Sequence, residues 1–199
     1  PIGRGALYFF KENTMTTSNV TAINTTTNIA LAEFIPGVAG SIPSRNGFVG
    51  VPAKKAHSFD REIFRNLLWF ECDSNDDYLL IVGPMGTGKT STVQQFYSRL
   101  DGAVFQFNAT NTSEANDLLG QWVMGKDGMT FVEGPLVRAA REGAVLLINE
   151  FDMMPPGEQV GFNDIFGDGF VRLPMKGGEE VAIQDGFSVI ITANHMGIG

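Results

Sequence analysis

Residues 78–90 constrain the fold of this chain more than any other stretch, because an apolar run, a glycine-rich loop and a helical pattern follow one another directly. Residues 78–82 have the composition of a buried strand, and residues 83–90 fit the pattern G-x-x-x-x-G-K-[ST]. The segment after the loop has one apolar helical face, since large side chains recur at i, i+3, i+4 and i+7: Val93, Phe96, Tyr97 and Leu100. This succession predicts a phosphate-binding loop at the start of a helix.

The residue types in the loop suit a nucleoside triphosphate. Glycines let successive backbone N–H groups converge on phosphate oxygens at the N-terminus of the helix. We expect Lys89 to contact the β- and γ-phosphates and the Thr90 hydroxyl to coordinate Mg²⁺. The predicted nucleotide-binding residues are Gly83, Pro84, Met85, Gly86, Thr87, Gly88, Lys89, Thr90 and Ser91. The alternative is a glycine-rich loop that matches the pattern by chance.

Composition limits the environment and the partners of the chain. Of its 199 residues, 43% are hydrophobic and 18% charged, as in a soluble globular protein, and no apolar run approaches the length of a membrane span. The net charge of −8 opposes non-specific attraction to nucleic acid and to anionic lipid. Cys72 is the single cysteine, which leaves no internal disulfide and no zinc-type cluster. We expect a cytoplasmic protein with no membrane partner and no nucleic-acid partner.

Residues 1–50 differ in composition from the rest of the chain. Residues 11–28 are rich in Thr and Asn with little apolar periodicity, and Gly and Pro interrupt the sequence from residue 36 to residue 50. Their apolar residues are too few and too irregular to close a separate core. We interpret residues 1–50 as an N-terminal extension with one short helix, and residues 51–199 as the core domain.

Strand and helix patterns alternate through residues 60–194, which predicts a parallel α/β sheet flanked by helices. Helices are expected at residues 60–70 with Asp60 as N-cap, at 112–119 with Thr112 or Ser113 as N-cap, at 135–143, and from 155 onward with Val160, Ile165 and Phe166. Further strands are expected at 103–107, 144–148 and 187–194. Two β-hairpins are expected, at residues 122–132 and 169–184. The apolar residues of the first hairpin either cap the core or project toward a partner.

A polar residue pair follows the most apolar of these strands. Asn149 and Glu150 come directly after residues 144–148, and Asn194 ends the last strand. Ligands of parallel α/β sheets bind at the carboxyl ends of the strands, so these residues are aimed toward the phosphate-binding loop. We predict that Glu150 polarises an attacking water molecule; the alternative is a solvated loop carboxylate.

Three segments, in this order, resemble the AAA+ ATPases of the MoxR type, the group that includes CobS, NorQ and CbbQ. They are residues 83–90 as Walker A, residues 146–152 as Walker B and residues 189–194 as sensor 1. Between them, residues 117–122 and 133–144 look like the helix-2 insertion of that group and the helix that follows it. The resemblance covers residues 51–199 and implies an AAA+ core with a P-loop NTPase sheet.

The resemblance implies an ATP- and Mg²⁺-dependent ATPase that works as a homo-oligomeric ring, commonly a hexamer. Such rings remodel a protein partner or assist metal insertion, often with a von Willebrand A-domain partner. The implied catalytic residues are Lys89, Glu150 and Asn194, and the implied metal-binding residues are Thr90 and Asn149. In this group the hairpin at residues 122–132 faces the pore or the substrate.

The chain departs from the family pattern in two places. Walker B normally reads Asp-Glu, whereas this chain has Asn149 before Glu150, and a neutral amide holds Mg²⁺ less strongly than a carboxylate does. We therefore expect slow hydrolysis, with Asp152 as a candidate substitute. The chain also stops after sensor 1, where the family continues into an arginine-finger segment, a fifth strand and a helical lid. We therefore expect a truncated chain. Without an arginine finger, which supplies about 10³ to 10⁵ in rate, its activity should be weak. Without the fifth strand, the first strand or its neighbour should be an exposed sheet edge.

Several functions stay open at this point. An ATP-driven, ring-forming remodelling subunit is favoured, and the second hypothesis is an assembly scaffold that binds ATP without hydrolysing it. A nucleic-acid motor is disfavoured by the acidic balance and by the lack of a Lys/Arg run in residues 51–199. A small-molecule P-loop kinase explains neither the hairpin nor the sensor 1 segment.

Overall fold

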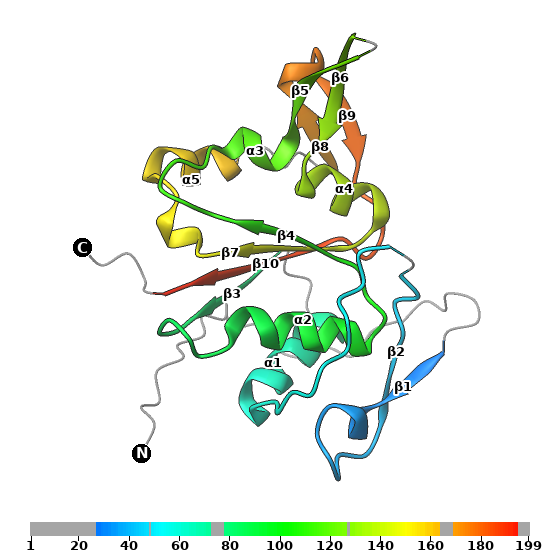
Figure 1. Cartoon of the computed structure of the whole chain (residues 1–199). Coiled ribbons are helices and arrows are strands. Elements are labelled where there is room, and N and C mark those ends of the chain that lie inside the picture. The colour runs from blue at the N-terminus through cyan, green and yellow to red at the C-terminus, as the bar shows by residue number, and fades with distance from the viewer. Residues whose placement is uncertain (1–26, 48, 73–77, 127, 164–168, 195–199) are drawn as a thin grey trace.

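A parallel sheet lies at the centre of the computed structural model, which describes residues 27–47, 49–72, 78–126, 128–163 and 169–194 (Figure 1). Its strands are β3 (Tyr78–Val82), β10 (Ser188–Ala193), β7 (Val145–Asn149) and β4 (Val104–Asn108), hydrogen-bonded in that order. Every pairing between them is parallel. The predicted α/β architecture is confirmed, and within the described sheet β3 is an outer strand, as expected.

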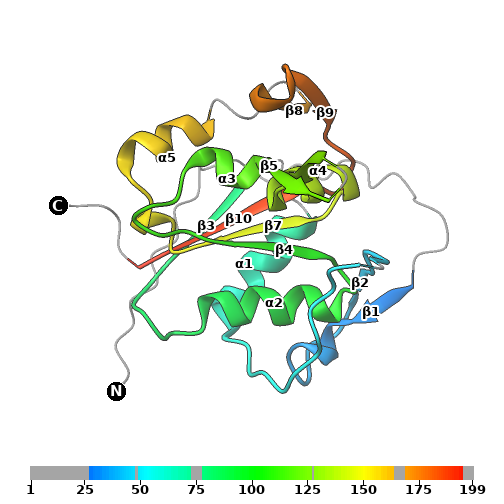
Figure 2. The ribbon, with the colours of Figure 1, turned by 45° about the horizontal axis from the view of Figure 1, so that its top comes forward.

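Helices cover both faces of this sheet. The helices α1 (Arg61–Cys72) and α2 (Lys89–Arg99) lie on one face, and α3 (Ala115–Leu119), α4 (Pro135–Glu142) and α5 (Pro156–Asn163) lie on the other (Figures 1 and 2). The central strand β7 is buried along its whole length because its alternate side chains enter two different apolar clusters. Val145 and Leu147 pack with α1 and α2, whereas Leu146 and Ile148 pack with α3 and α4.

The two helices of the first face begin and pack as predicted. Asp60 caps α1, since its Oδ1 accepts hydrogen bonds from the N–H groups of Glu62 at 2.9 Å and Ile63 at 3.2 Å. The predicted apolar face of α2 is entirely buried: Val93, Phe96, Tyr97 and Leu100 are each 0% exposed. Since α2 starts directly after the glycine-rich loop, burying this face fixes the orientation of the loop.

The predicted N-cap of α3 is wrong. The cap is Glu114, whose side chain accepts from the backbone of Asp117, while Asp117 Oδ2 accepts from Glu114 N at 3.0 Å. Ser113 Oγ accepts instead from Thr110 N at 3.0 Å, in the turn before the helix. The next helix is as expected: α4 begins at Pro135 and ends before a left-handed Gly143, with φ of 60°.

Both predicted hairpins form, and they lie together beyond α4 (Figure 1). The first pairs β5 (Gly120–Gly125) with β6 (Gly128–Glu133), and the second pairs β8 (Phe170–Leu173) with β9 (Glu179–Ala182), both antiparallel. Trp122 Nε1 links them by donating to Met175 O at 2.9 Å. The first hairpin projects, although Phe131 packs against the core, because its other large apolar residues are exposed: Trp122, Val123, Met124, Met129 and Val132.

The helix expected from residue 155 onward is present as α5. Val160 on α5 is 65% exposed, and Ile165 and Phe166 lie outside the described residues. Among the helices that the structure describes, none combines the length and the apolar character needed to cross a membrane.

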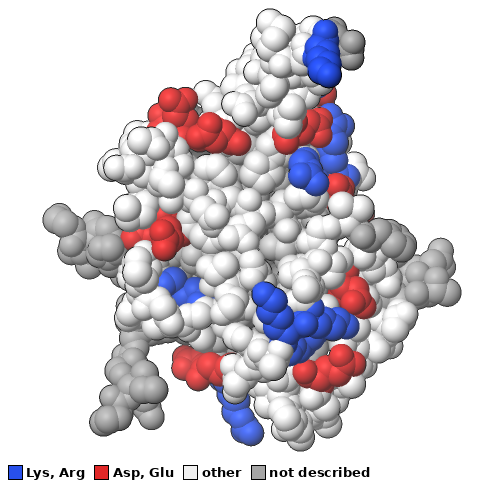
Figure 3. Space-filling model, in the orientation of Figure 1, with Lys and Arg blue, Asp and Glu red and all other residues white. Residues whose placement is uncertain are grey.

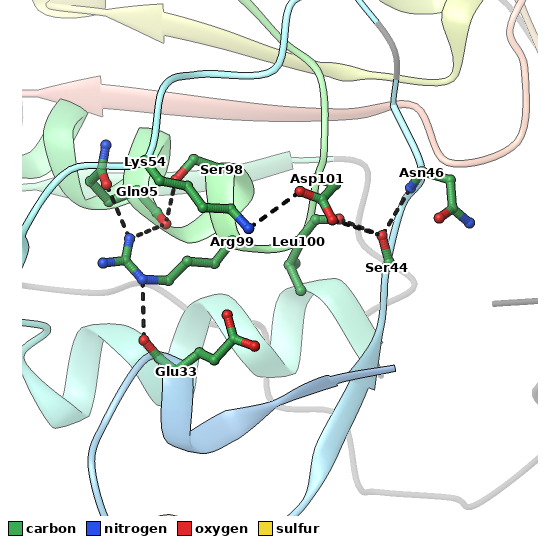
Figure 4. Close-up of polar contacts among 9 residues, drawn as sticks. All are labelled: Glu33, Ser44, Asn46, Lys54, Gln95, Ser98, Arg99, Leu100 and Asp101. Carbon is green, nitrogen blue, oxygen red and sulfur yellow. Dashed lines mark hydrogen bonds and ion pairs between the residues drawn. The ribbon is translucent and has the colours of Figure 1, made fainter. Parts of the chain in front are cut away.

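The described part of residues 1–50 packs against the helices of the first face. Strands β1 (Asn28–Ala30) and β2 (Ser41–Pro43) pair antiparallel around a 3-10 turn at Leu31–Glu33. Their buried apolar residues join the cluster around α1 and α2: Ile29, Phe34, Ile35 and Ile42. Polar contacts fasten the same segment to α2, with Arg99 donating to Glu33 O and Ser44 donating to Leu100 O (Figure 4).

A charged cluster joins this segment to three other elements. Arg45 forms two parallel hydrogen bonds with Glu71, from Nε to Oε1 at 2.6 Å and from Nη2 to Oε2 at 2.9 Å. Tyr97 OH donates to the same carboxylate at 3.0 Å, and Arg45 Nη1 donates to Gly186 O at 2.8 Å. Burial and the Glu71 charge together raise the pKa of Tyr97, which keeps its phenol protonated as the donor.

Arg45→Ala is therefore expected to lower the free energy of unfolding by about 2–3 kcal/mol, because it leaves the partly buried Glu71 carboxylate without its cation. Urea unfolding followed by circular dichroism measures this. Arg172→Ala is the matched control, since Arg172 pairs with Glu180 on the surface, where such pairs contribute about 1 kcal/mol or less. If the two variants lose the same unfolding free energy, the segment around Arg45 does not belong to the folded core.

Candidate functional site

The predicted site lies at the carboxyl ends of β3, β10 and β7. The loop of residues 83–88 connects the end of β3 to the start of α2, and Gly83 N donates to Ala193 O at the end of β10 at 3.2 Å. Parallel pairing brings these strand ends to one edge of the sheet (Figure 1). The edge therefore contains the loop and the polar residues that follow β7 and β10.

Two of the three loop glycines have the left-handed backbone conformation that glycine favours, and Gly83 does not. Gly86 and Gly88 have φ values of 79° and 84°, in the left-handed region that disfavours side chains, and no heavy atom lies within 4 Å of a Cβ built on Gly86. Gly88 is the residue before α2, so the first N–H groups of that helix lie at the loop. An open backbone next to a helix N-terminus can bind an anion.

Lys89 lies across the mouth of this loop. Its Nζ donates to Gly83 O at 2.7 Å, to Pro84 O at 3.0 Å and to Asn194 Oδ1 at 3.1 Å. The structure thus brings together Lys89 and Asn194, which are 105 residues apart in the sequence.

The pKa of Lys89 is lowered overall, although two opposing effects act on it. Partial burial lowers the pKa of its ammonium, and the negative charges of Asp152 and Glu150 raise it again. Both carboxylates therefore act on the same ammonium group, and the cation faces the side of the sheet where β7 ends.

Thr90 contacts Asn149, as their predicted shared role requires. Thr90 Oγ1 donates to Asn149 Oδ1 at 2.6 Å, and the Asn149 side chain is buried, with 4% of the residue exposed. A hydroxyl oxygen and an amide oxygen thus meet at the first turn of α2. Oxygen atoms are the ligands that Mg²⁺ prefers.

Glu150 follows Asn149 in a left-handed conformation, with φ of 54° and ψ of 41°. This region costs a non-glycine residue about 1–3 kcal/mol, and it recurs at functional sites. The Glu150 side chain is exposed, and its backbone N donates to Thr192 Oγ1 at 3.3 Å. Glu150 therefore lies at the same sheet edge as the loop, with its carboxylate open to solvent.

Asp152, considered above as a substitute metal ligand, has another contact. Its Oδ1 accepts from Asn194 N at 3.1 Å, across the ends of β7 and β10. This bond holds the backbone of Asn194, whose side chain reaches Lys89. Asp152 thus acts on the position of Asn194 in this structure.

The residues present fit the predicted nucleotide and metal. Among the described residues, no group of three or more His, Cys, Asp or Glu side chains could hold a metal by itself. Mg²⁺ in nucleotide sites is usually bound by few protein groups together with phosphate oxygens, which agrees with the Thr90 and Asn149 pair. Lys89 supplies the cation for the phosphates, and the loop supplies the N–H groups.

Two residues of the site were missed from the sequence. Asn108, at the end of β4, accepts from Asn149 Nδ2 at 2.9 Å. Thr192, in β10, contacts both Asn149 and Glu150. The strand-end rule would have found Asn108 if the predicted strand had been extended from Phe107 by one residue, whereas Thr192 had no such signal.

This sheet order, with the loop after β3 and polar residues after β7 and β10, defines a P-loop NTPase. The family model described as the AAA domain of the dynein-related subfamily matches residues 78–198, more than half of the chain. The chain belongs to this AAA family. The resemblance to the MoxR-type AAA+ ATPases is confirmed.

Curated relatives support the same placement. Denitrification regulatory protein NirQ of Stutzerimonas stutzeri is 26% identical over 162 residues, covering 81% of this chain and 57% of NirQ. Protein NorQ of Paracoccus denitrificans is 28% identical over 121 residues, covering 61% of this chain and 45% of NorQ. A solved structure of NtrX from Brucella abortus is 19% identical, covers 70% of this chain and 31% of its own, and has a TM-score of 0.49. The chain spans about half the length of the curated relatives it matches.

Lys89→Ala is expected to abolish ATP binding, because the phosphates lose the cation that lies at the mouth of the loop. Isothermal titration calorimetry with ATP and Mg²⁺ measures the affinity. Lys54→Ala serves as the control, since Lys54 is an exposed lysine that pairs with Asp101. Unchanged affinity in Lys89→Ala would contradict the assignment of the loop.

Proposed function

We propose that this chain is the nucleotide-binding core of a ring-forming AAA+ ATPase subunit of the MoxR type. In this proposal ATP binding and hydrolysis drive the remodelling of a protein partner or the insertion of a metal. The observation that carries it is the convergence of Lys89 with Asn194, and of Thr90 with Asn149, at one edge of the sheet.

Each residue has a role that its position supports. Lys89 and the loop N–H groups bind the β- and γ-phosphates, and Thr90 and Asn149 hold Mg²⁺. Bound Mg²⁺ would neutralise charge on the phosphates and orient them. The solvent-exposed Glu150 polarises the attacking water, and Asn194, held by Asp152, positions that water.

The assembly and the partners are proposed from the family resemblance. We place the subunit in the cytoplasm, in a homo-oligomeric ring, commonly a hexamer, that acts on a protein client with a von Willebrand A-domain partner. The exposed apolar residues of the β5–β6 hairpin support a contact with such a client, because large apolar side chains that stay exposed in one chain mark interaction surfaces.

A second candidate is an assembly scaffold that binds ATP without hydrolysing it. The observation that favours it is the amide of Asn149 where the family has a carboxylate, since this amide contributes no negative charge toward Mg²⁺. Nucleotide-dependent oligomerisation without phosphate release would select the scaffold.

A nucleic-acid motor has less support. The net charge is −8, and basic and acidic side chains are interspersed over the face seen in Figure 3. Salt-sensitive binding to DNA would revive this alternative.

Glu150→Gln is expected to retain ATP binding and to remove whatever hydrolysis a full-length version of the protein shows, because the amide cannot accept a proton from water. Phosphate release and calorimetric affinity are measured in parallel. Glu142→Gln, an exposed residue at the end of α4, is the matched control. Hydrolysis at the wild-type rate in Glu150→Gln would remove Glu150 from the proposed mechanism.

Asn149→Asp is expected to strengthen the Mg²⁺ dependence of ATP binding, because a carboxylate replaces the neutral amide that Thr90 contacts. The affinity for ATP is measured over a series of MgCl₂ concentrations. If the variant follows the wild-type curve, another group already holds the metal.

A further inference from the structure

We propose that Asn108 is a positioning residue for the metal side of the site. It holds the Asn149 side chain so that its oxygen, and not its nitrogen, faces Thr90. This inference rests on the proposed ATP- and Mg²⁺-binding function, and it extends that function to a residue on β4, at the far edge of the described sheet.

Asn149 presents its side-chain oxygen to two threonine hydroxyls. Thr192 Oγ1, in a residue only 1% exposed, accepts from Glu150 N at 3.3 Å and directs its own hydrogen to Asn149 Oδ1 at 3.4 Å. Thr90 Oγ1 donates to the same oxygen at 2.6 Å. In this structure two hydroxyl groups donate to one amide oxygen, and the NH₂ group of Asn149 points the other way. Because a hydroxyl can also accept, these contacts do not fix the amide by themselves, and the partner of the NH₂ group decides its orientation.

Asn108 receives that NH₂ group. Its Oδ1 accepts from Asn149 Nδ2 at 2.9 Å and also from Gln106 Nε2 at 2.9 Å. Gln106 Oε1 in turn accepts from Gln94 Nε2 at 2.7 Å. Asn108 Oδ1 therefore accepts from two amide NH₂ groups, Gln106 on one side and Asn149 on the other, and Gln94 on α2 supports Gln106 in turn.

An amide at residue 149 needs this support in a way that a carboxylate does not. A carboxylate presents an oxygen in either orientation, whereas a turned amide would present a donor to Thr90 and to a bound cation. Cations are repelled by the positive end of an N–H group. Asn108 thus supplies the acceptor that an amide at residue 149 needs and that the usual Walker B carboxylate does not.

The test compares Asn108→Leu, which removes the acceptor at similar size, with Asn108→Asp, which keeps an acceptor and has no NH₂ group. ATP affinity of the whole 199-residue chain is measured by calorimetry over a series of MgCl₂ concentrations. We expect Asn108→Leu to raise the Mg²⁺ concentration that gives half of the maximal gain in ATP affinity. The rise should be about fivefold, the effect of losing one hydrogen bond. Asn108→Asp is expected to need no more Mg²⁺ than wild type.

The controls separate positioning from folding and from the function itself. Asn116→Ala, an exposed amide on α3, should behave as wild type, and all variants should bind ATP equally in EDTA and unfold at similar temperatures. The inference about Asn108 is wrong if Asn108→Leu needs no more Mg²⁺ than the wild type, or if Asn108→Asp raises the Mg²⁺ requirement as much as Asn108→Leu does. Either result would leave the proposed function standing. A wild-type chain whose ATP binding ignores Mg²⁺ would overturn the proposed function as well.

Discussion

Parallel pairing of β3, β10 and β7 is the constraint on which the rest of this structure depends. It brings the ends of three strands to one edge of the sheet, where Lys89 and Asn194 come into hydrogen-bond contact although they are far apart in the sequence. Burial of the apolar face of α2 then fixes the direction in which the loop faces. Without this pairing the same residues would be separate polar groups on unrelated loops.

The electrostatics of this site differ from the usual family pattern, in which Walker B reads Asp-Glu. Lys89 is the cation; burial lowers its pKa, and the charges of Asp152 and Glu150 offset only part of this effect. Asn149 contributes only a dipole, and a dipole acts on a cation through its orientation. The site therefore depends on hydrogen bonds that hold one amide in place, and these involve Thr192 and Asn108.

The sequence predicted those features that depend on local pattern. The strand–loop–helix unit, the buried β7 and the hairpins each follow from spacing within about 15 residues of one another. The strand-end rule also predicted which distant residues converge, such as Lys89 and Asn194, but it did not predict individual side-chain pairs such as Asn108 and Asn149, which are 41 residues apart. The packing of residues 27–47 was missed for a related reason. Their apolar residues have no periodicity of their own because they fill space against α1 and α2.

The most direct measurement is a crystal structure of the chain with Mg²⁺ and a non-hydrolysable ATP analogue. The account predicts that Lys89 Nζ exchanges contacts with the loop carbonyls for the phosphates, and that Thr90 Oγ1 lies within about 2.0–2.3 Å of the metal. Glu150 and Asn194 should face the terminal phosphate. A nucleotide bound elsewhere, or a metal remote from both Thr90 and Asn149, would contradict the central claim.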